Sequence, residues 1–293
     1  MKRILSTMFI ALFSFIVLPF GFAGERSNAL VLQEMTWTDV HEYLKTNDMV
    51  IIPLGSTEQH GPHMPLGTDT YESVGMSKKI SEQTGILVAP VLWSGYSLYH
   101  SGFPGSLSLK PETMEEVLFE TVEMLMKYGF RRFMFFNYHG GNNIVQDNII
   151  HRINHTTEAT AVAIGHGSPM QVFEDGQFFD WHAGLGETSI MLYLRPDLVR
   201  MDRLEKPVIT FSEKQETLHK LSEEHPELAP VFSAQFGVPA ETGKGGASHE
   251  LSSNGIWSFS DVKAASAQRG KARVEAMVAN AVKFIEAWKK VSR

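Results

Sequence analysis

Side chains that can bind divalent metal ions gather in three short stretches of this sequence. The first, IIPLGSTEQHGPHMPLGTD, begins at residue 51 as an apolar run and then brings Glu58, His60 and Asp69 close together. The second, NYHGGNN, contains His139, and the third, DWHAGLGETS, contains Glu187. Imidazole and carboxylate groups suit Zn²⁺, Mn²⁺ or Fe²⁺. Five such ligands exceed what one zinc ion needs, whereas two ions that share a bridging carboxylate would use them all.

The prediction of a metal site rests on the clustering of these residues in three stretches. A lone histidine in a loop is more often hydrogen-bonded or solvent-facing than bound to a metal. His63 lies inside the first stretch, and we expect it to support the ligands rather than to bind an ion. His100 and the remaining histidines outside the three stretches receive no ligand role.

Strands that alternate with helices must position these stretches. Apolar runs predict strands over 48–55, 86–92, 131–137 and 160–165. Amphipathic periodicity, caps and terminal glycines predict helices over 68–85, 110–129, 142–156 and 186–194. Nearly all-apolar strands in this order predict an α/β fold with a mostly parallel sheet covered on both faces. Right-handed crossovers place all the strand-to-helix loops at the carboxyl edge of the sheet, where sites of such folds lie.

Composition limits the class of protein. The chain has 293 residues, enough for one large α/β domain or two small ones, and its formal net charge is −7 with no basic stripe, so nucleic-acid binding has no electrostatic support. The absence of cysteine excludes a disulfide framework, a thiolate metal site and a cysteine nucleophile.

The N-terminal residues have the pattern of a secretory signal peptide. Lys2 and Arg3 precede a long apolar run that ends at small residues, and we expect cleavage after Ala23. The mature chain would hold 24 basic and 33 acidic residues and would be exported, to the periplasm or the medium. The alternative is an uncleaved membrane anchor, which would be the only membrane contact, because no later segment is apolar enough to span a bilayer.

The motifs PLGSTEQHGPHMPLGTD, NYHGGN and HAGLGETS resemble those of the creatininase (creatinine amidohydrolase) family, as do HSGFPGSLSL and NGIWSFSDVKAASAQRG. The resemblance extends over about residues 32 to 285. It implies a three-layer α/β/α sandwich with a mostly parallel central sheet, here as a single domain over 24–293. It also implies a homo-oligomer, with a hexamer among the forms expected.

The resemblance further implies a centre with two divalent ions, Zn and/or Mn, or Fe. Glu58 and His139 would hold one ion, His60 and Glu187 the other, and Asp69 would bridge them. Creatininase itself has an additional glutamate ligand two positions after the histidine of the second motif, where this chain has Gly141. The resemblance therefore supports a shared metal centre more strongly than it supports a shared substrate.

Two ions at such a centre would lower the pKa of a shared water and polarise a substrate carbonyl. The leaving nitrogen needs a proton, and we expect His182 to supply it as a general acid; its alternative role is a supporting hydrogen bond. With Glu187 it completes the candidate catalytic pair. The candidate pocket residues are Tyr138, Trp181, His100 and Asp180. The polar segment 205–250 could be a lid, a subunit contact or an excursion from the domain.

The favoured function is an exported metal-dependent amidohydrolase that cleaves a non-peptide C–N bond in a small, preferably cyclic, amide. One alternative is a peptide-trimming or deformylating hydrolase with the same centre. Another is a periplasmic protein that binds a metal or ligand without turnover, which would need neither a bridging acid nor a proton donor. A nucleotide-binding domain is disfavoured, because no G-x-G-x-x-G follows the first strand and no P-loop occurs.

Overall fold

A parallel sheet forms the centre of the molecule. The computed structural model describes residues 27–165 and 180–291. Within those residues four strands pair in parallel in the spatial order β2-β1-β3-β4. The strands are β1 (Met49–Leu54), β2 (Leu87–Val88), β3 (Arg132–Asn137) and β4 (Thr160–Ile164). The predicted signal peptide, residues 1–23, lies outside the described residues, so its cleavage stays a prediction.

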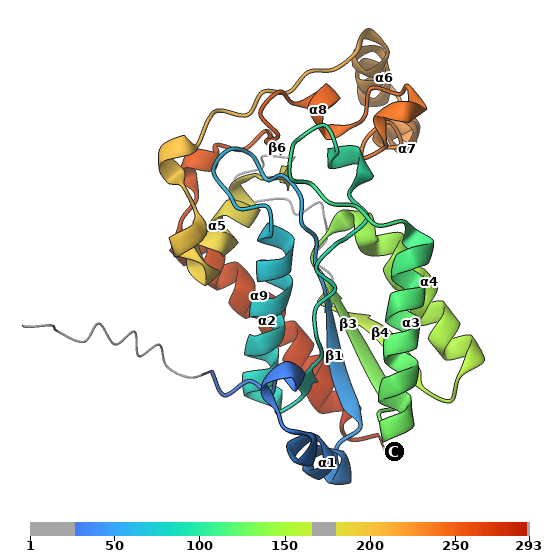
Figure 1. Ribbon diagram of the computed structural model, residues 1–293. Helices are drawn as coiled ribbons and strands as arrows, with labels where there is room; N and C mark the ends of the chain where they lie inside the picture. Colours follow the sequence, from blue (N-terminus) through green and yellow to red (C-terminus); the bar gives the residue numbers. More distant parts are fainter. Residues whose placement is uncertain (1–26, 166–179, 292–293) are drawn as a thin grey trace, which may run out of the picture.

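Helices cover both faces of this sheet (Figure 1). One hydrophobic core takes in α2 (Thr68–Thr84), α5 (Leu185–Leu194) and α9 (Ala267–Trp288). The other takes in α1 (Trp37–Thr46), α3 (Pro111–Tyr128) and α4 (Asn143–Thr156). Alternate residues of β1 feed the two cores, because side chains of a strand point to opposite faces in turn: Met49 and Ile51 join the first core and Val50 and Ile52 the second. The predicted three-layer α/β/α architecture is confirmed.

The ends of the helices follow local chemistry. The four predicted helices agree with the structure to within one residue at each end. Pro111 starts α3, where its missing N–H costs nothing, and Gly129 ends it with φ of 115°. Gly85 ends α2 in the same left-handed region, with φ of 66°, which a side chain would disfavour.

The second predicted strand, 86–92, is shorter than expected. Regular pairing covers only Leu87–Val88 and resumes as a single bridge between Leu54 and Leu92. Pro90 interrupts it, because proline has no N–H to donate to a neighbouring strand.

Segment 205–250 folds back over the carboxyl edge of the sheet (Figure 1). Its helices are α6 (Glu213–Glu224), α7 (Ala229–Ser233) and α8 (Ser248–Leu251), and the antiparallel pair β5 (Asp180–His182) and β6 (Trp257–Ser258) lies beneath it. The Phe236 ring packs on Trp257 at 4.9 Å between centroids, and Trp257 packs on Trp181 at 4.5 Å. These contacts attach the segment to the site described below.

No helix among the described residues combines the length and the apolar composition that crossing a membrane requires.

Candidate metal centre

Three segments bring the five predicted ligands together at the carboxyl edge of the sheet. Glu58 and His60 follow β1, and His139 follows β3. Asp69 and Glu187 lie in the first turns of α2 and α5. Parallel strands end at the same edge, so loops that are distant in sequence meet there.

The five side chains form two groups of three that share Asp69. One group is Glu58, Asp69 and His139, and the other is His60, Asp69 and Glu187; in each group the potential ligand atoms lie within 4.8 Å of one another. The shared carboxylate divides its two oxygens between the groups. Oδ2 lies 3.1 Å from Nδ1 of His139, and Oδ1 lies 3.2 Å from Nε2 of His60. This is the arrangement expected of a carboxylate that bridges two ions.

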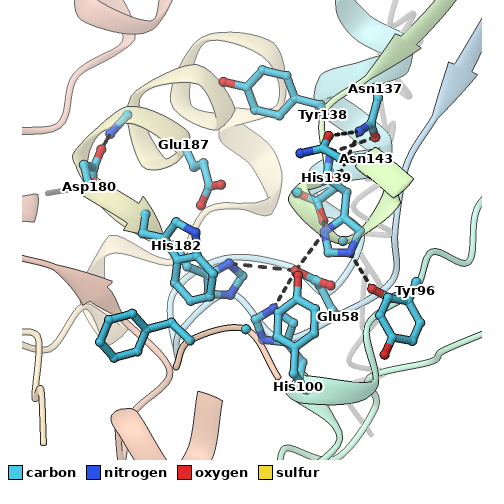
Figure 2. A pocket seen from close by; sticks show the side chains of 18 of the residues that line it. Glu58, Tyr96, His100, Asn137, Tyr138, His139, Asn143, Asp180, His182 and Glu187 are labelled. Atoms are coloured by element: carbon cyan, nitrogen blue, oxygen red, sulfur yellow. Dashed lines mark hydrogen bonds and ion pairs between the residues drawn. The ribbon is translucent and has the colours of Figure 1, made fainter. Parts of the chain in front are cut away.

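The remaining distances complete each group. Glu58 Oε1 lies 3.3 Å from Nδ1 of His139, and Glu187 Oε2 lies 3.8 Å from Nε2 of His60. Figure 2 shows Glu58, His139 and Glu187 facing a common space from different elements. The residues thus converge on one place from separate parts of the chain.

Burial and unsatisfied atoms show that the residues fit metal ions. Glu58, His60, Asp69 and His139 are all buried, and Nε2 of His60 and Oδ2 of Asp69 make no hydrogen bond with any described residue. Burying several charged groups without full pairing is costly. Divalent cations of the class that imidazole and carboxylate prefer would satisfy these atoms.

Main-chain carbonyls orient the two histidine ligands. Nδ1 of His60 lies 3.1 Å from the Glu58 carbonyl oxygen, and Nε2 of His139 lies 3.0 Å from the Tyr96 carbonyl oxygen. A carbonyl only accepts, so these nitrogens must carry hydrogen and donate it. In each neutral ring the other nitrogen then presents its lone pair to the centre, as a metal ligand requires.

Without metal, the centre holds protons in place of cations. Burial would lower the pKa of His60, but the carboxylates of Asp69, Glu187 and Glu58 outweigh it and raise the pKa to about 10. Burial raises the pKa of Glu187 to about 7, and Asp69 contributes in the same direction although His60 opposes it. Metal binding must displace such protons, so it is expected to strengthen as pH rises.

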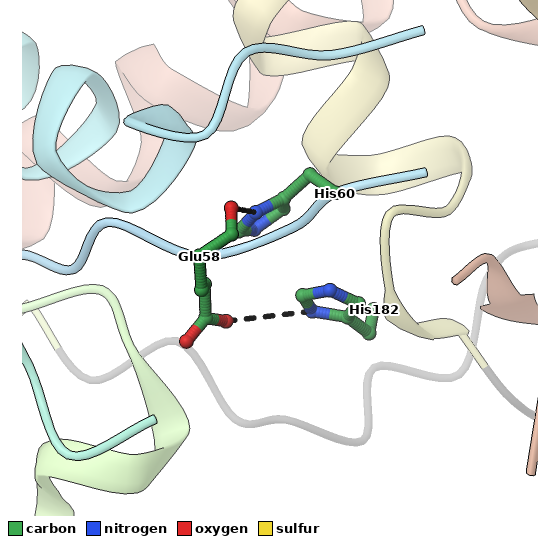
Figure 3. Close-up of side chains that lie close together, drawn as sticks. All are labelled: Glu58, His60 and His182. Atoms are coloured by element: carbon green, nitrogen blue, oxygen red, sulfur yellow. Dashed lines mark hydrogen bonds and ion pairs between the residues drawn. The ribbon is translucent and has the colours of Figure 1, made fainter. Parts of the chain in front are cut away.

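His182 lies beside the ligands, and a main-chain carbonyl holds one of its ring nitrogens. Its Nε2 donates to the Gln59 carbonyl oxygen at 2.6 Å, and its Nδ1 lies 3.8 Å from Glu58 Oε1 (Figure 3). Burial and the nearby rings of His60 and His100 lower the pKa of His182 well below its usual range. The ring is therefore neutral in this arrangement and has no proton on Nδ1 to give until it accepts one. It also forms a third potential ligand group with Glu58 and His60.

His100, which received no ligand role, supports the centre from behind Glu58. Its Nε2 lies 3.1 Å from Glu58 Oε1, and its Nδ1 lies 2.7 Å from the Ser248 hydroxyl and 3.1 Å from the Gln59 amide nitrogen. With two donors at Nδ1, the ring donates from Nε2 to the carboxylate. The sequence signal was its place in HSGFPGSLSL.

His63 has the supporting place predicted for it: its Nε2 lies 2.9 Å from the Thr188 hydroxyl in α5, next to Glu187.

A cavity of about 490 Å³ opens onto the centre. All four predicted pocket residues line it, namely Tyr138, Trp181, His100 and Asp180. The Asp180 carboxylate also accepts hydrogen bonds from the Leu185 and Gly186 amides at 2.9 and 2.6 Å, so it holds the start of α5.

Sequence patterns did not indicate several further residues at the site. Phe236 lines the cavity from the segment between α7 and α8, Arg273 lines it from α9, and Tyr99 lies there as well. Glu72 lies one turn after Asp69, fully buried, with both carboxyl oxygens free of hydrogen bonds to described residues. Burial, followed by the charges of Glu187 and Asp69, raises the pKa of Glu72 well above its usual range.

The family model for creatininase, described as creatinine amidohydrolase, matches residues 33–285. The chain therefore belongs to the creatininase family, and the resemblance seen in its motifs is confirmed. A solved structure of manganese creatininase superposes with a TM-score of 0.70 at 25% identity and covers 90% of this chain and 100% of that one.

Two relatives of this chain have different names. The chain is 32% identical over 188 residues to a 3-dehydro-scyllo-inosose hydrolase of Thermotoga maritima, covering 61% of this chain and 60% of that protein. It is 35% identical over 172 residues to a mycofactocin precursor peptide peptidase of Mycolicibacterium smegmatis, covering 53% and 62%. The chain thus spans about three fifths of the length of these relatives, and they differ from each other in what they act on.

Proposed function

We propose that this chain is a metal-dependent hydrolase that cleaves a carbon–nitrogen bond in a small amide at a centre for two divalent ions. The observation that carries the proposal is the position of Asp69, whose two oxygens serve two separate ligand groups. A protein that only stored or carried a metal would need no shared carboxylate between two sites.

Zn²⁺ and Mn²⁺ are the ions that the donor set supports best, with Fe²⁺ as a further option. Manganese is present in the related creatininase structure. When bound, such ions supply Lewis acidity toward a carbonyl oxygen and lower the pKa of water toward neutrality. The ligands Glu58, Asp69 and His139 would hold one ion, and His60, Asp69 and Glu187 the other.

His182 is suited to carry a proton between the two halves of the reaction. Its neutral ring presents an unprotonated Nδ1 toward the centre, while the Gln59 carbonyl holds the opposite nitrogen. It can accept a proton as the attacking water is deprotonated and donate it to the departing nitrogen. The general-acid role expected for His182 would thus be the second step of a relay.

The cavity favours a compact substrate. At about 490 Å³ it has the size of a small-molecule pocket, and Tyr96, Tyr99, Trp181 and Phe236 give it aromatic walls. A planar amide or a small ring would pack against such walls. Peptide trimming is the second candidate, supported by the 35% identity to the peptide peptidase.

Metal analysis and a substrate panel test the proposal together. Purified protein should hold up to two divalent ions, and Asp69→Asn should lose most of both because it weakens two sites at once. Lactams, hydantoins and short peptides should reveal turnover that a chelator abolishes and added metal restores. A protein that binds no divalent ion would contradict the proposal, and metal without turnover on the whole panel would favour the binding alternative.

We also propose that residues 1–23 direct export to the periplasm or the medium and that the protein is a homo-oligomer. The supports are the signal-peptide pattern and the resemblance to the family. N-terminal sequencing of exported protein should begin after Ala23, and light scattering should give a multiple of the chain mass. An intact N-terminus on cytoplasmic protein, or a monomer, would contradict the respective proposal.

A further inference from the structure

A guanidinium group faces the cavity beside the metal centre. Arg273 comes from α9 and lines the cavity together with Gly186 and Glu187. Its Nη1 lies so close to Gly186 that a Cβ built at that position would collide with it. The glycine that precedes a candidate metal ligand thus leaves room for an arginine from a distant helix.

The Arg273 side chain is half-buried, and part of its guanidinium group has no partner. Its Nε is shielded from solvent and makes no hydrogen bond with any described residue. Tyr138, Glu72, Asp180 and Glu187 act on its charge only through space, with no hydrogen bond from any of them. Leaving a shielded donor of a charged group unsatisfied is costly, and the rest of the group faces the cavity, which points to a partner supplied from outside the chain.

The neighbouring acids are committed elsewhere. Both oxygens of Asp180 accept main-chain hydrogen bonds at the start of α5. Glu187 Oε2 accepts from the Ala183 amide at 2.6 Å and faces His60 in its ligand group. Two divalent cations would balance the three ligand carboxylates and the Asp180 carboxylate that also lines the cavity, so the guanidinium would leave the cavity with a net positive charge.

We propose that Arg273 is a specificity-determining residue that binds a carboxylate of the substrate, so the preferred substrate is an amide that carries a carboxylate group. The planar fork of a guanidinium matches a carboxylate through two parallel hydrogen bonds. This inference rests on the proposed hydrolase function, since it names the class of amide that the same site accepts.

Matched pairs of ring amides test it without any mutation. The pairs are 2-pyrrolidinone and 5-oxoproline, dihydrouracil and dihydroorotate, and hydantoin and hydantoin-5-acetate, which differ mainly by a carboxylate. Calorimetry on the metal-loaded protein should show at least one carboxylated member binding about 10- to 100-fold more tightly than its neutral twin, the gain typical of charged hydrogen bonds. Failure of every carboxylated probe to bind more tightly than its twin would overturn the inference.

Variants then assign the preference to the arginine. Arg273→Gln should reduce it to near unity, and Arg273→Lys should keep part of it because the charge remains and the fork is lost. Arg269→Gln is the matched control, an exposed arginine one turn earlier on α9, and it should leave the preference unchanged. Metal content and melting temperature are measured for each variant.

A preference that persists in folded, metal-loaded Arg273→Gln would show that the carboxylate binds the metals instead, and it would overturn the inference. Turnover without any carboxylate preference would also overturn it and leave the hydrolase function standing. Carboxylate binding that depends on Arg273, with no turnover of any probe, would support this recognition and count against hydrolysis. If Arg273→Gln does not fold, the inference is still tested by the binding of the matched amide pairs to the wild-type protein and to Arg273→Lys.

Discussion

The histidines of the centre work because their hydrogen bonds settle which nitrogen is free. In His60, His139 and His182, one ring nitrogen donates a hydrogen bond to a main-chain carbonyl. The other nitrogen is thereby turned toward the space that the carboxylates surround. At the scale of single residues, the chemistry depends as much on these partners as on the ligands.

Replacing His182 separates the proton relay from metal binding. His182→Ala should keep its divalent ions and lower kcat by about 10²- to 10⁴-fold, the usual contribution of a positioned acid–base group. Metal content and steady-state kinetics on an active panel substrate measure both effects. Unchanged kcat would remove His182 from the mechanism, and loss of metal would make it a ligand with Glu58 and His60.

Replacing His100 tests whether Glu58 must be oriented. His100→Ala removes the ring that contacts Glu58 at 3.1 Å, and it should weaken metal affinity or activity by about 10- to 100-fold, as loss of such support typically does. His225→Ala is the control, because that side chain is 57% exposed. Metal titration of both variants is the measurement, and equal affinities would show that Glu58 is held without His100.

At the scale of elements, the packing of α5 on α9 joins two parts of the site. α5 carries Glu187, and α9 carries Arg273. The helices approach so closely at Gly270 that an added Cβ would overlap the main-chain oxygen of Ser189. The distance between a candidate ligand and the proposed carboxylate-binding arginine therefore depends on a glycine that touches neither.

Gly270→Val should force the two helices apart. Overpacking of this kind costs about 1–3 kcal/mol, so the melting temperature should fall and activity should fall with it. Ala276→Val, on an exposed position of the same helix, controls for the branched side chain itself. Thermal unfolding of the two variants is compared, and an equal melting temperature for both would show that the contact is not tight.

At the scale of the whole molecule, the carboxyl edge of the sheet concentrates buried charge that the core does not need. The folded protein without metal holds extra protons there, since the pKa of His60 is about 10 and that of Glu187 about 7. Both values lie above those of unfolded chains, so folding takes up protons between the unfolded and the folded values. The metal-free fold is thus stabilised by protons that are lost as pH rises.

The metal-free protein should therefore melt at lower temperature as pH increases from about 6 to about 9. The pKa values of Glu58 and Asp69 are lowered in the folded protein, so these two groups change its stability only in acid, below this pH window. Divalent ions compete better at high pH, so the gap between melting temperatures with added metal and with chelator should widen. Scanning calorimetry at several pH values measures it, and a gap that stays constant would contradict the proton occupancy of the centre.

Much of the fold and of the ligand set could be predicted from the sequence, because both leave local patterns. Apolar runs and terminal glycines such as Gly85 and Gly129 predicted the helices and three of the four strands almost to the residue, whereas the strand predicted over 86–92 is regular only at Leu87–Val88. The order of the elements placed three polar motifs at one edge, and the five candidate ligands do meet there. The direction in which His182 holds its proton was not predictable, because it depends on the Gln59 carbonyl.

The sequence by itself determined the layered sheet, through periodicity, and the family and the residues that can bind metal, through its motifs. Only the tertiary structure decided that Asp69 divides its oxygens, that His100 supports Glu58 and that Arg273 faces the cavity. From the sequence alone, an arginine such as Arg273, near the start of an amphipathic helix, is expected to face solvent. Its actual surroundings come from α5, a segment about 80 residues earlier, and contacts between such distant segments leave no local pattern.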